Sequence, residues 1–139
     1  MTESITFTIY GNQEDENGNP LGYHRTTQNS SWNPASRRYE RWKEYVRQTF
    51  FDAGYKADDV DDLKSKLNVK PISTSEKRTA RMDIQMEFAN NTRPDCSNVY
   101  KGIEDALFRN DKYVMWGNFS GITSKEKKGK VKVTIHFIK

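Results

Sequence analysis

Three segments of the chain alternate apolar and polar residues with a period of two, and this pattern constrains the fold more than any other feature of the sequence. They are residues 5–10, 81–88 and 130–137. Successive side chains of a β-strand point to opposite faces of its sheet, so each segment predicts a strand with one buried and one exposed face. The chain must therefore form a sheet that is covered on one side.

Two segments with helical periodicity can supply this cover. They lie at about 37–51 and 97–108, and Ser36 stands where it can cap the first of them. Their apolar residues are Tyr39, Trp42, Val46, Thr49 and Phe50 in the first segment, and Val99, Ile103, Ala106 and Leu107 in the second. Strands and helices interleaved in this order predict an α+β fold, in which a mixed β-sheet is packed by two main helices.

The remaining segments carry weaker patterns. Residues at about 11–35 are rich in Asn, Gly, Gln and Ser and predict a long loop, and residues 124–130 predict a lysine-rich hairpin loop. A short helix with an acidic first turn is predicted at 58–67, and a short strand at 113–116. With a length of 139 residues, these elements predict one domain that spans 1–139.

The composition excludes several classes of protein. Only 34% of the residues are hydrophobic, but seven Phe, seven Tyr and three Trp argue against a disordered chain. No apolar run approaches the roughly 20 residues of a membrane helix, and the N-terminus does not resemble a signal peptide. Cys96 is the single cysteine, so no internal disulfide can form. We expect a cytoplasmic protein that does not contact a membrane.

The net charge of +4 is spread unevenly along the chain. Residues 24–51 contain six basic and two acidic side chains, and residues 123–139 contain six lysines and one glutamate. Basic patches bind polyanions such as nucleic acids through counterion release. A solvated surface that only keeps the protein soluble explains the same charges, so the charge pattern alone leaves both interpretations open.

One motif is more specific than the charge pattern. Residues 93–107 read RPDCSNVYKGIEDAL, in which Asp95, Asn98, Lys101 and Asp105 recur at fixed spacing, with Ala and Leu directly after the last of them. This stretch resembles the central signature of the RusA-type Holliday junction resolvases. That signature has an Asp, a second Asp two residues on, an Asn directly after it, a Lys three further, and then Asp-Ala-Leu.

The resemblance covers nearly the whole chain. The first strand followed by Gly11, the pair Asn33-Pro34 ahead of a basic helix, and the closing Lys-Gly-strand pattern all come in the order of the family. It implies a RusA-like single domain that forms a homodimer, depends on Mg²⁺ and binds four-way DNA junctions. Such endonucleases cut paired strands in DNA recombination and repair, and they are often encoded by phages.

The resemblance also implies roles for the residues of the motif. Asp95 is the implied catalytic metal ligand, although as the residue before a helix it is equally suited to be an N-cap. Lys101 is expected to meet the scissile phosphate. Asn98 and Asp105 are expected to be structural parts of the motif.

The sequence departs from the signature at its acidic positions. Ser97 stands where the family has its second aspartate, and the later acidic pair falls at 114–118, which contain no carboxylate. Trp116 occupies or adjoins that place. Asp111 is several residues too early, whereas Asp83 and Glu87 share one face of a predicted strand and are possible replacements. One aspartate does not suffice for a two-metal site, so we expect cleavage to be weak or lost.

Two functional hypotheses follow. In the first, the chain is a RusA-like phage-type protein that binds branched DNA, with its Mg²⁺-dependent endonuclease activity weak or lost. In the second, the RusA-like scaffold is catalytically dead and has been reused as a protein-interaction module, for example a phage factor that targets a host protein. The residues predicted to contact DNA are Arg25, Arg37, Arg38, Lys43, Arg93, Lys125, Lys127, Lys128 and Lys130.

Overall fold

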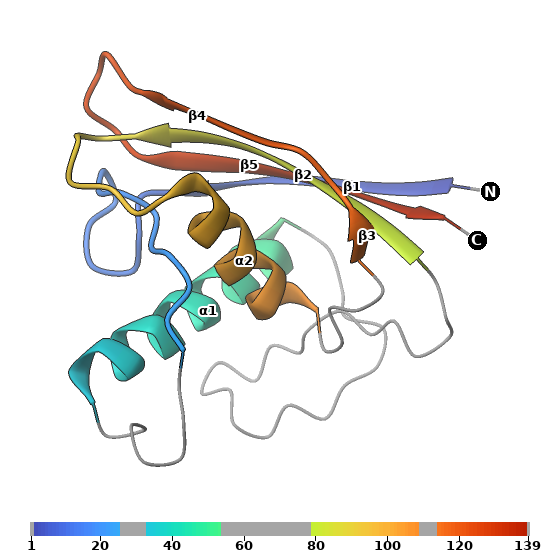
Figure 1. Cartoon of the computed structure of the whole chain (residues 1–139), viewed down its shortest axis with the longest axis horizontal. Helices are drawn as coiled ribbons and strands as arrows, with labels where there is room; N and C mark the ends of the chain where they lie inside the picture. The colour runs from blue at the N-terminus through green and yellow to red at the C-terminus, as the bar shows by residue number, and fades with distance from the viewer. Residues whose placement is uncertain (1, 26–32, 54–78, 109–113, 139) are drawn as a thin grey trace.

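The three alternating segments form neighbouring strands of one sheet in the computed structural model of the chain (Figure 1). They are β1 (Thr2–Tyr10), β2 (Thr79–Phe88) and β5 (Lys130–Ile138). The last strand lies between the other two and is antiparallel to both. The structure describes residues 2–25, 33–53, 79–108 and 114–138, and all structural statements below concern these ranges.

Two shorter strands share the outer side of β2. They are β3 (Val114–Trp116) and β4 (Phe119–Thr123), which both run parallel to β2 and follow one another along it. Gly117 and Asn118 separate the two. The short strand predicted near 116 is confirmed as β3, but β4 was not predicted. All five of its residues are exposed, so its sequence lacks the alternation that marks a half-buried strand.

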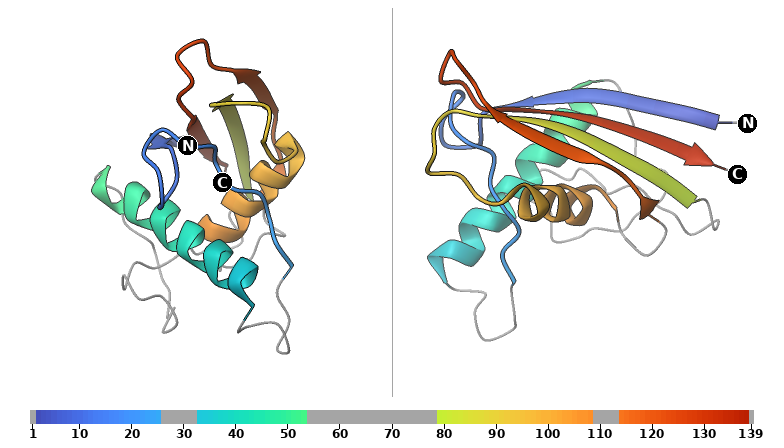
Figure 2. Two further views of the ribbon diagram at one scale, coloured as in Figure 1. Left: turned by 90° about the vertical axis from the view of Figure 1, so that its left-hand side faces the viewer. Right: turned by 45° about the horizontal axis from the view of Figure 1, so that its top comes forward.

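Two helices cover one face of the sheet, as the periodic segments predicted. Both α1 (Pro34–Asp52) and α2 (Cys96–Leu107) lie on the same side in each view of Figure 2. The buried side chains of β2 face them: Met82, Ile84, Met86 and Phe88 are each at most 2% exposed. The predicted apolar residues Tyr39, Trp42, Val46 and Phe50 of α1 are also buried. The α+β prediction is confirmed.

The predicted start of the first helix is wrong. Asn33 caps α1, since its side chain accepts a hydrogen bond of 2.8 Å from the backbone N–H of Ala35. Pro34 then takes the first helical position, which suits proline because the N–H it lacks has no partner there. Ser36, the predicted cap, is a buried residue inside the first turn. The predicted helix at 58–67 lies outside the described residues.

Asparagine side chains hold the described part of the long loop, residues 11–25, against the sheet. Asn19 contacts the turn that follows β2: its amide N–H groups donate to Asn90 Oδ1 and Thr92 O at 3.0 and 2.9 Å. Its Oδ1 accepts from the N–H of Ala89 at 2.6 Å. A second asparagine, Asn12, donates to the backbone oxygen of Asn19 at 2.7 Å. These side chains hold the loop together with backbone hydrogen bonds, such as that from the N–H of Tyr23 to Asn98 O, although residues 11–25 contain no strand or helix.

This arrangement predicts that Asn19→Ala destabilises the fold. The substitution leaves the Ala89 N–H and the amide contacts without a partner, and we expect the free energy of unfolding to fall by about 1–3 kcal/mol. Urea denaturation followed by circular dichroism measures the change. Asn91→Ala is the matched control, because Asn91 is exposed and the change there should be about 0.5 kcal/mol or less. Equal stability of both variants would contradict the role of Asn19.

Candidate functional site

Asp95 lies directly before α2 and exposes its carboxylate. Its backbone oxygen accepts hydrogen bonds from the N–H groups of Asn98 and Val99, at 3.0 and 3.1 Å. Its side chain makes no capping hydrogen bond, and the residue is exposed. The backbone of Asp95 therefore starts the helix, while its carboxylate stays free to meet a cation or solvent.

The neighbours of Asp95 on α2 add no second carboxylate. Ser97 is exposed and uncharged. Cys96 is partly buried and packs toward the sheet, where a Cβ atom added to Gly121 would lie 2.7 Å from its Sγ and 2.9 Å from the ring of Phe88. The start of α2 therefore exposes one acid, Asp95, and contacts β4 through Cys96 and Gly121, which carry no charge.

The strands beside α2 also lack acids. From Val114 to Thr123, through β3 and β4, the sequence contains no Asp or Glu. A Cβ atom at Gly117 would overlap the backbone oxygen of Met82 and the hydroxyl of Tyr100. That hydroxyl already donates a hydrogen bond of 2.9 Å to Met82 O. An acidic side chain therefore has no room at position 117 unless the backbone moves.

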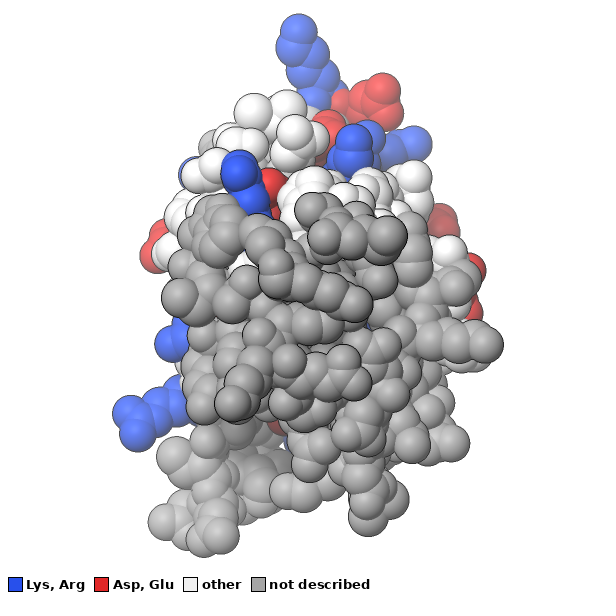
Figure 3. All heavy atoms as spheres, turned by 90° about the vertical axis from the view of Figure 1, so that its right-hand side faces the viewer, with Lys and Arg blue, Asp and Glu red and all other residues white. Residues whose placement is uncertain are grey.

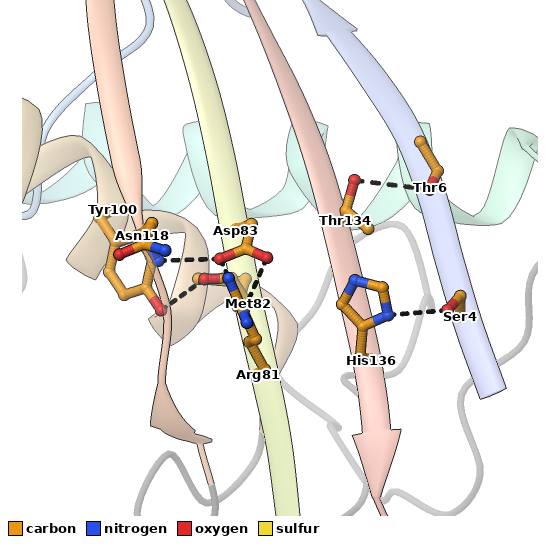
Figure 4. A network of polar contacts seen from close by, with 9 residues as sticks. All are labelled: Ser4, Thr6, Arg81, Met82, Asp83, Tyr100, Asn118, Thr134 and His136. Carbon is orange, nitrogen blue, oxygen red and sulfur yellow. Dashed lines mark hydrogen bonds and ion pairs between the residues drawn. The ribbon is translucent and has the colours of Figure 1, made fainter. Parts of the chain in front are cut away.

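The two acids of β2 lie on the other face of the sheet. Asp83 is ion-paired with Arg81 at 2.9 Å and accepts a hydrogen bond of 2.9 Å from the N–H of Asn118 (Figure 4). Glu87 is ion-paired with Lys130 at 3.1 Å. Because α2 packs on the face of Met82 and Ile84, both carboxylates point away from Asp95. Neither carboxylate lies beside Asp95, and Asp111 lies outside the described residues.

The described residues therefore do not fit a divalent-metal site of the expected kind. Among them, no group of three or more His, Cys, Asp or Glu side chains comes close enough together to hold a metal ion. Mg²⁺ keeps several waters but still requires carboxylate charge, and two ions side by side require more. Asp95 alone supplies one negative charge at the entrance of α2.

Asp105, the second acid of the motif, joins the two helices. Its Oδ2 accepts a hydrogen bond of 2.7 Å from the hydroxyl of Tyr39 on α1. The ammonium of Lys43 lies 3.4 Å from the same oxygen and 3.1 Å from Glu40. Burial, followed by the hydrogen bond to Asp105, raises the pKa of Tyr39 well above its usual range. Lys43, a predicted DNA contact, is thus engaged in ion pairs inside the protein, with 15% of its side chain exposed.

Lys101 lies over an aromatic ring beside α2. Its Nζ is 4.2 Å from the centre of the Tyr23 ring, and the residue is exposed. The N–H of Tyr23 donates a hydrogen bond of 2.9 Å to the backbone oxygen of Asn98. A Cβ at Gly102 would come within 3.2 Å of Tyr23 N, so the absence of a side chain there permits the close approach. The Lys101 charge is therefore held near the helix but remains open to an anion.

The exposed basic residues of the C-terminal stretch gather at one end of the sheet. Three loops meet there, namely the loop after β1, the turn after β2 and the hairpin between β4 and β5 (Figure 1). The N–H of Gly11 donates to Gly129 O at 2.8 Å, and the N–H of Gly129 donates to Asn17 O at 3.0 Å. We call this region the loop end. Its exposed predicted DNA contacts are Arg93, Lys125, Lys127, Lys128 and Lys130.

The remaining predicted contacts lie elsewhere. Arg37 and Arg38 are exposed on the first turn of α1, and Arg38 is ion-paired with Glu14 of the long loop. Arg25 is exposed at the end of the described loop. The face opposite the loop end shows basic and acidic side chains side by side on its described surface rather than one basic patch (Figure 3). The loop end is also mixed in charge, because the exposed acids Asp15, Glu16 and Glu126 lie among its lysines.

Tyr23, Tyr39 and Tyr100 were not predicted as parts of this region. The sequence does not indicate their roles, because each tyrosine contacts a residue that is distant in the chain. Only the spacing of Tyr39 on the apolar face of α1 indicated that it faces the core.

An exposed aspartate before α2, an exposed lysine six residues further along the chain and a hairpin with exposed lysines are compatible with phosphate contacts in an α+β nucleic-acid-binding protein. A family model described as Endodeoxyribonuclease RusA matches residues 17–136, and the chain belongs to this family. Membership implies DNA binding and cleavage of the Holliday junction resolvase type. Members typically depend on a divalent metal and act as dimers.

A search of curated proteins finds no match. Within the described ranges, neither helix is long and apolar enough to cross a membrane.

The crowding at Gly117 predicts different outcomes for an acid at position 97 and an acid at position 117, which lies within the stretch 114–118. Ser97→Asp should fold as the wild type does, because residue 97 is exposed. Gly117→Asp should lower the free energy of unfolding by about 2 kcal/mol or more, because the new Cβ overlaps Met82 O and the Tyr100 hydroxyl. Thermal and urea denaturation of the two variants test this. A Gly117→Asp protein as stable as Ser97→Asp would show that the backbone adapts at no cost.

Tyr100 predicts a pH dependence of stability. Burial, and then the nearby Glu104 carboxylate, raise the pKa of Tyr100 to about 12. The unfolded chain ionises at about pH 10, so this tyrosine stabilises the fold fully below about pH 10 and progressively less toward about pH 12. Tyr100→Phe should therefore make the loss of stability in this range shallower.

Denaturant titrations at several pH values measure this slope. Between about pH 7 and 9, where the tyrosine is protonated in both states, wild type and Tyr100→Phe should show the same pH dependence. If the two proteins lost stability equally between about pH 10 and 12, Tyr100 would not contribute to the pH dependence of stability.

Proposed function

We propose that the protein binds branched DNA and that its Mg²⁺-dependent endonuclease activity is weak or lost. The observation that carries this proposal is the single exposed carboxylate of Asp95 beside strands without any acid from Val114 to Thr123. DNA recognition depends on contacts with phosphates, which survive the loss of metal ligands because they use other residues. Catalysis does not survive it, since the ions must be held by carboxylates.

Several features support DNA binding. The lysine hairpin projects beyond the sheet at the loop end, and Lys101 exposes its ammonium above Tyr23. Arg25, Arg37 and Arg93 are exposed as well. Lys43 already forms ion pairs with Glu40 and Asp105, which a DNA phosphate would have to displace. We therefore expect Lys43 to contribute less to DNA binding than the exposed basic residues. A homodimer in the cytoplasm of a bacterial host, encoded by a phage or by the host, is the setting we propose.

A second function is favoured by a different observation. The strand β4 exposes one large apolar side chain on each face of the sheet edge, Phe119 on the helix side (45% exposed) and Ile122 on the open side (63% exposed). Such a surface fits a scaffold reused to bind another protein, for example a host protein targeted by a phage. This alternative predicts no preference for a DNA junction, whereas the first function requires one.

Binding to a synthetic four-way junction separates the two functions. We expect tighter binding to the junction than to duplex of the same length, and an affinity that falls as salt increases. The double substitution Lys125→Ala and Lys127→Ala should reduce the slope of log affinity against log salt by about 1 for each lost phosphate contact. Lys132→Ala, which removes one charge from the open sheet face, is the control and should leave the slope unchanged. Equal binding to junction and duplex would refute branched-DNA recognition.

Cleavage is tested with the same junction. In Mg²⁺ or Mn²⁺ we expect at most trace cutting, with no difference between the wild type and Asp95→Asn. Robust metal-dependent cutting that disappears in Asp95→Asn would refute the loss of activity and show that an acid outside the described ranges completes the site.

A further inference from the structure

The aromatic ring of Tyr23 supports the ammonium of Lys101. The Nζ atom of Lys101 lies 4.2 Å from the centre of the ring, within the range in which a cation is attracted to the electron-rich face of an aromatic side chain. Lys101 is an exposed residue of α2, whereas Tyr23 belongs to the long loop that follows β1. The contact is therefore made by the fold and not by neighbours in the sequence.

Tyr23 is itself held in place by three contacts. Its backbone N–H donates a hydrogen bond of 2.9 Å to Asn98 O. A Cβ atom at Gly102 would lie 3.2 Å from Tyr23 N, so the loop backbone passes directly over this glycine. The edge of the ring meets the ring of Tyr39, with 5.6 Å between the centres and an angle of 76° between the planes. The ring under Lys101 therefore has a fixed position relative to α2.

The contacts continue from Tyr39 back to α2. Tyr39 is 2% exposed, and its hydroxyl donates a hydrogen bond of 2.7 Å to Asp105 Oδ2. Asp105 follows Lys101 by four residues, which is about one turn of the same helix. The helix that carries Lys101 thus also anchors the aromatic pair on which its ammonium rests.

Lys43 shows what a different support would do. Its ammonium lies 3.1 Å from Glu40 and 3.4 Å from Asp105, and 15% of its side chain is exposed. These carboxylates hold the lysine but also balance its charge. The ring of Tyr23 is uncharged, so it restrains Lys101 and leaves its positive charge intact. N–H donors on the side of the ammonium away from the ring remain available to a phosphate oxygen.

We propose that Tyr23 is a positioning residue, whose ring holds the ammonium of Lys101 in place for a DNA phosphate. A mobile lysine loses rotamer freedom when it binds a phosphate, and a lysine that is already restrained loses less. The ring therefore strengthens this phosphate contact by about three- to tenfold in affinity, the range expected for one immobilised side chain. The inference rests on the proposed function, because it assigns Lys101 a phosphate.

Nuclear magnetic resonance of the full chain tests the contact itself. Protons above the face of an aromatic ring resonate upfield of their ordinary position. The ε-CH₂ protons of Lys101 should be shifted upfield in the wild type and in Tyr23→Phe, which keeps the ring. In Tyr23→Leu they should return to the ordinary position for lysine. A wild type whose Lys101 signals already lie there overturns the proposal without any variant.

Binding to a synthetic four-way junction in the presence of EDTA tests the consequence for DNA. Tyr23→Leu should weaken binding about three- to tenfold, and Tyr23→Phe should bind as the wild type does. When Lys101→Ala is already present, Tyr23→Leu should cause no further loss, because the two residues act through one contact. Phe119→Leu is the control: it removes an exposed ring that packs against Tyr100, and it should leave the affinity unchanged.

The outcomes separate this inference from the proposed function. Circular dichroism and thermal denaturation establish that each variant is folded, and Tyr23→Met replaces Tyr23→Leu if the latter is not. Equal weakening by Tyr23→Leu with and without Lys101, or wild-type binding by Lys101→Ala, overturns the role of Tyr23. Equal binding to junction and duplex refutes branched-DNA recognition, and the same set of variants measured on duplex then decides the role of Tyr23. A protein that binds no DNA overturns both.

Discussion

The hydrogen bond from Tyr39 to Asp105 fixes how the two helices of the layer meet. It joins α1 to α2 at 2.7 Å, and Lys43 neutralises the carboxylate from the same side. A partly buried carboxylate without these partners would destabilise the packing of both helices, because a charge removed from water requires compensation. The acid of the Asp-Ala-Leu stretch therefore contributes to the packing of the two helices.

Two residues of the motif contribute to the packing of the helix layer. Lys101 lies over the ring of Tyr23, and Asp105 accepts a hydrogen bond from the hydroxyl of Tyr39. Asn98 contacts Tyr23 through its backbone oxygen, a contact that any residue at this position could make. Ser97 is exposed, so substitution there should change the stability less than substitution of Asp105.

The sequence predicted those elements whose patterns come from burial. Strands β1, β2 and β5 and the apolar faces of both helices follow directly from side-chain periodicity. The start of α1 was misplaced because Ser36 and Asn33 are both good capping residues, and only Pro34 favours the earlier one. β4 and the crowding around Gly117 were beyond prediction, since an exposed strand has no period and a lack of space depends on Met82 and Tyr100, distant in the chain.

The tight fit around Gly117 limits which residues this position can accept. Met82 O and the Tyr100 hydroxyl occupy the volume that a side chain would need there. A substitution at 117 therefore requires coordinated changes in β2 and α2, whereas an exposed position such as Ser97 can change by itself. Sequence variation near the start of β4 is then confined to the exposed positions around this glycine.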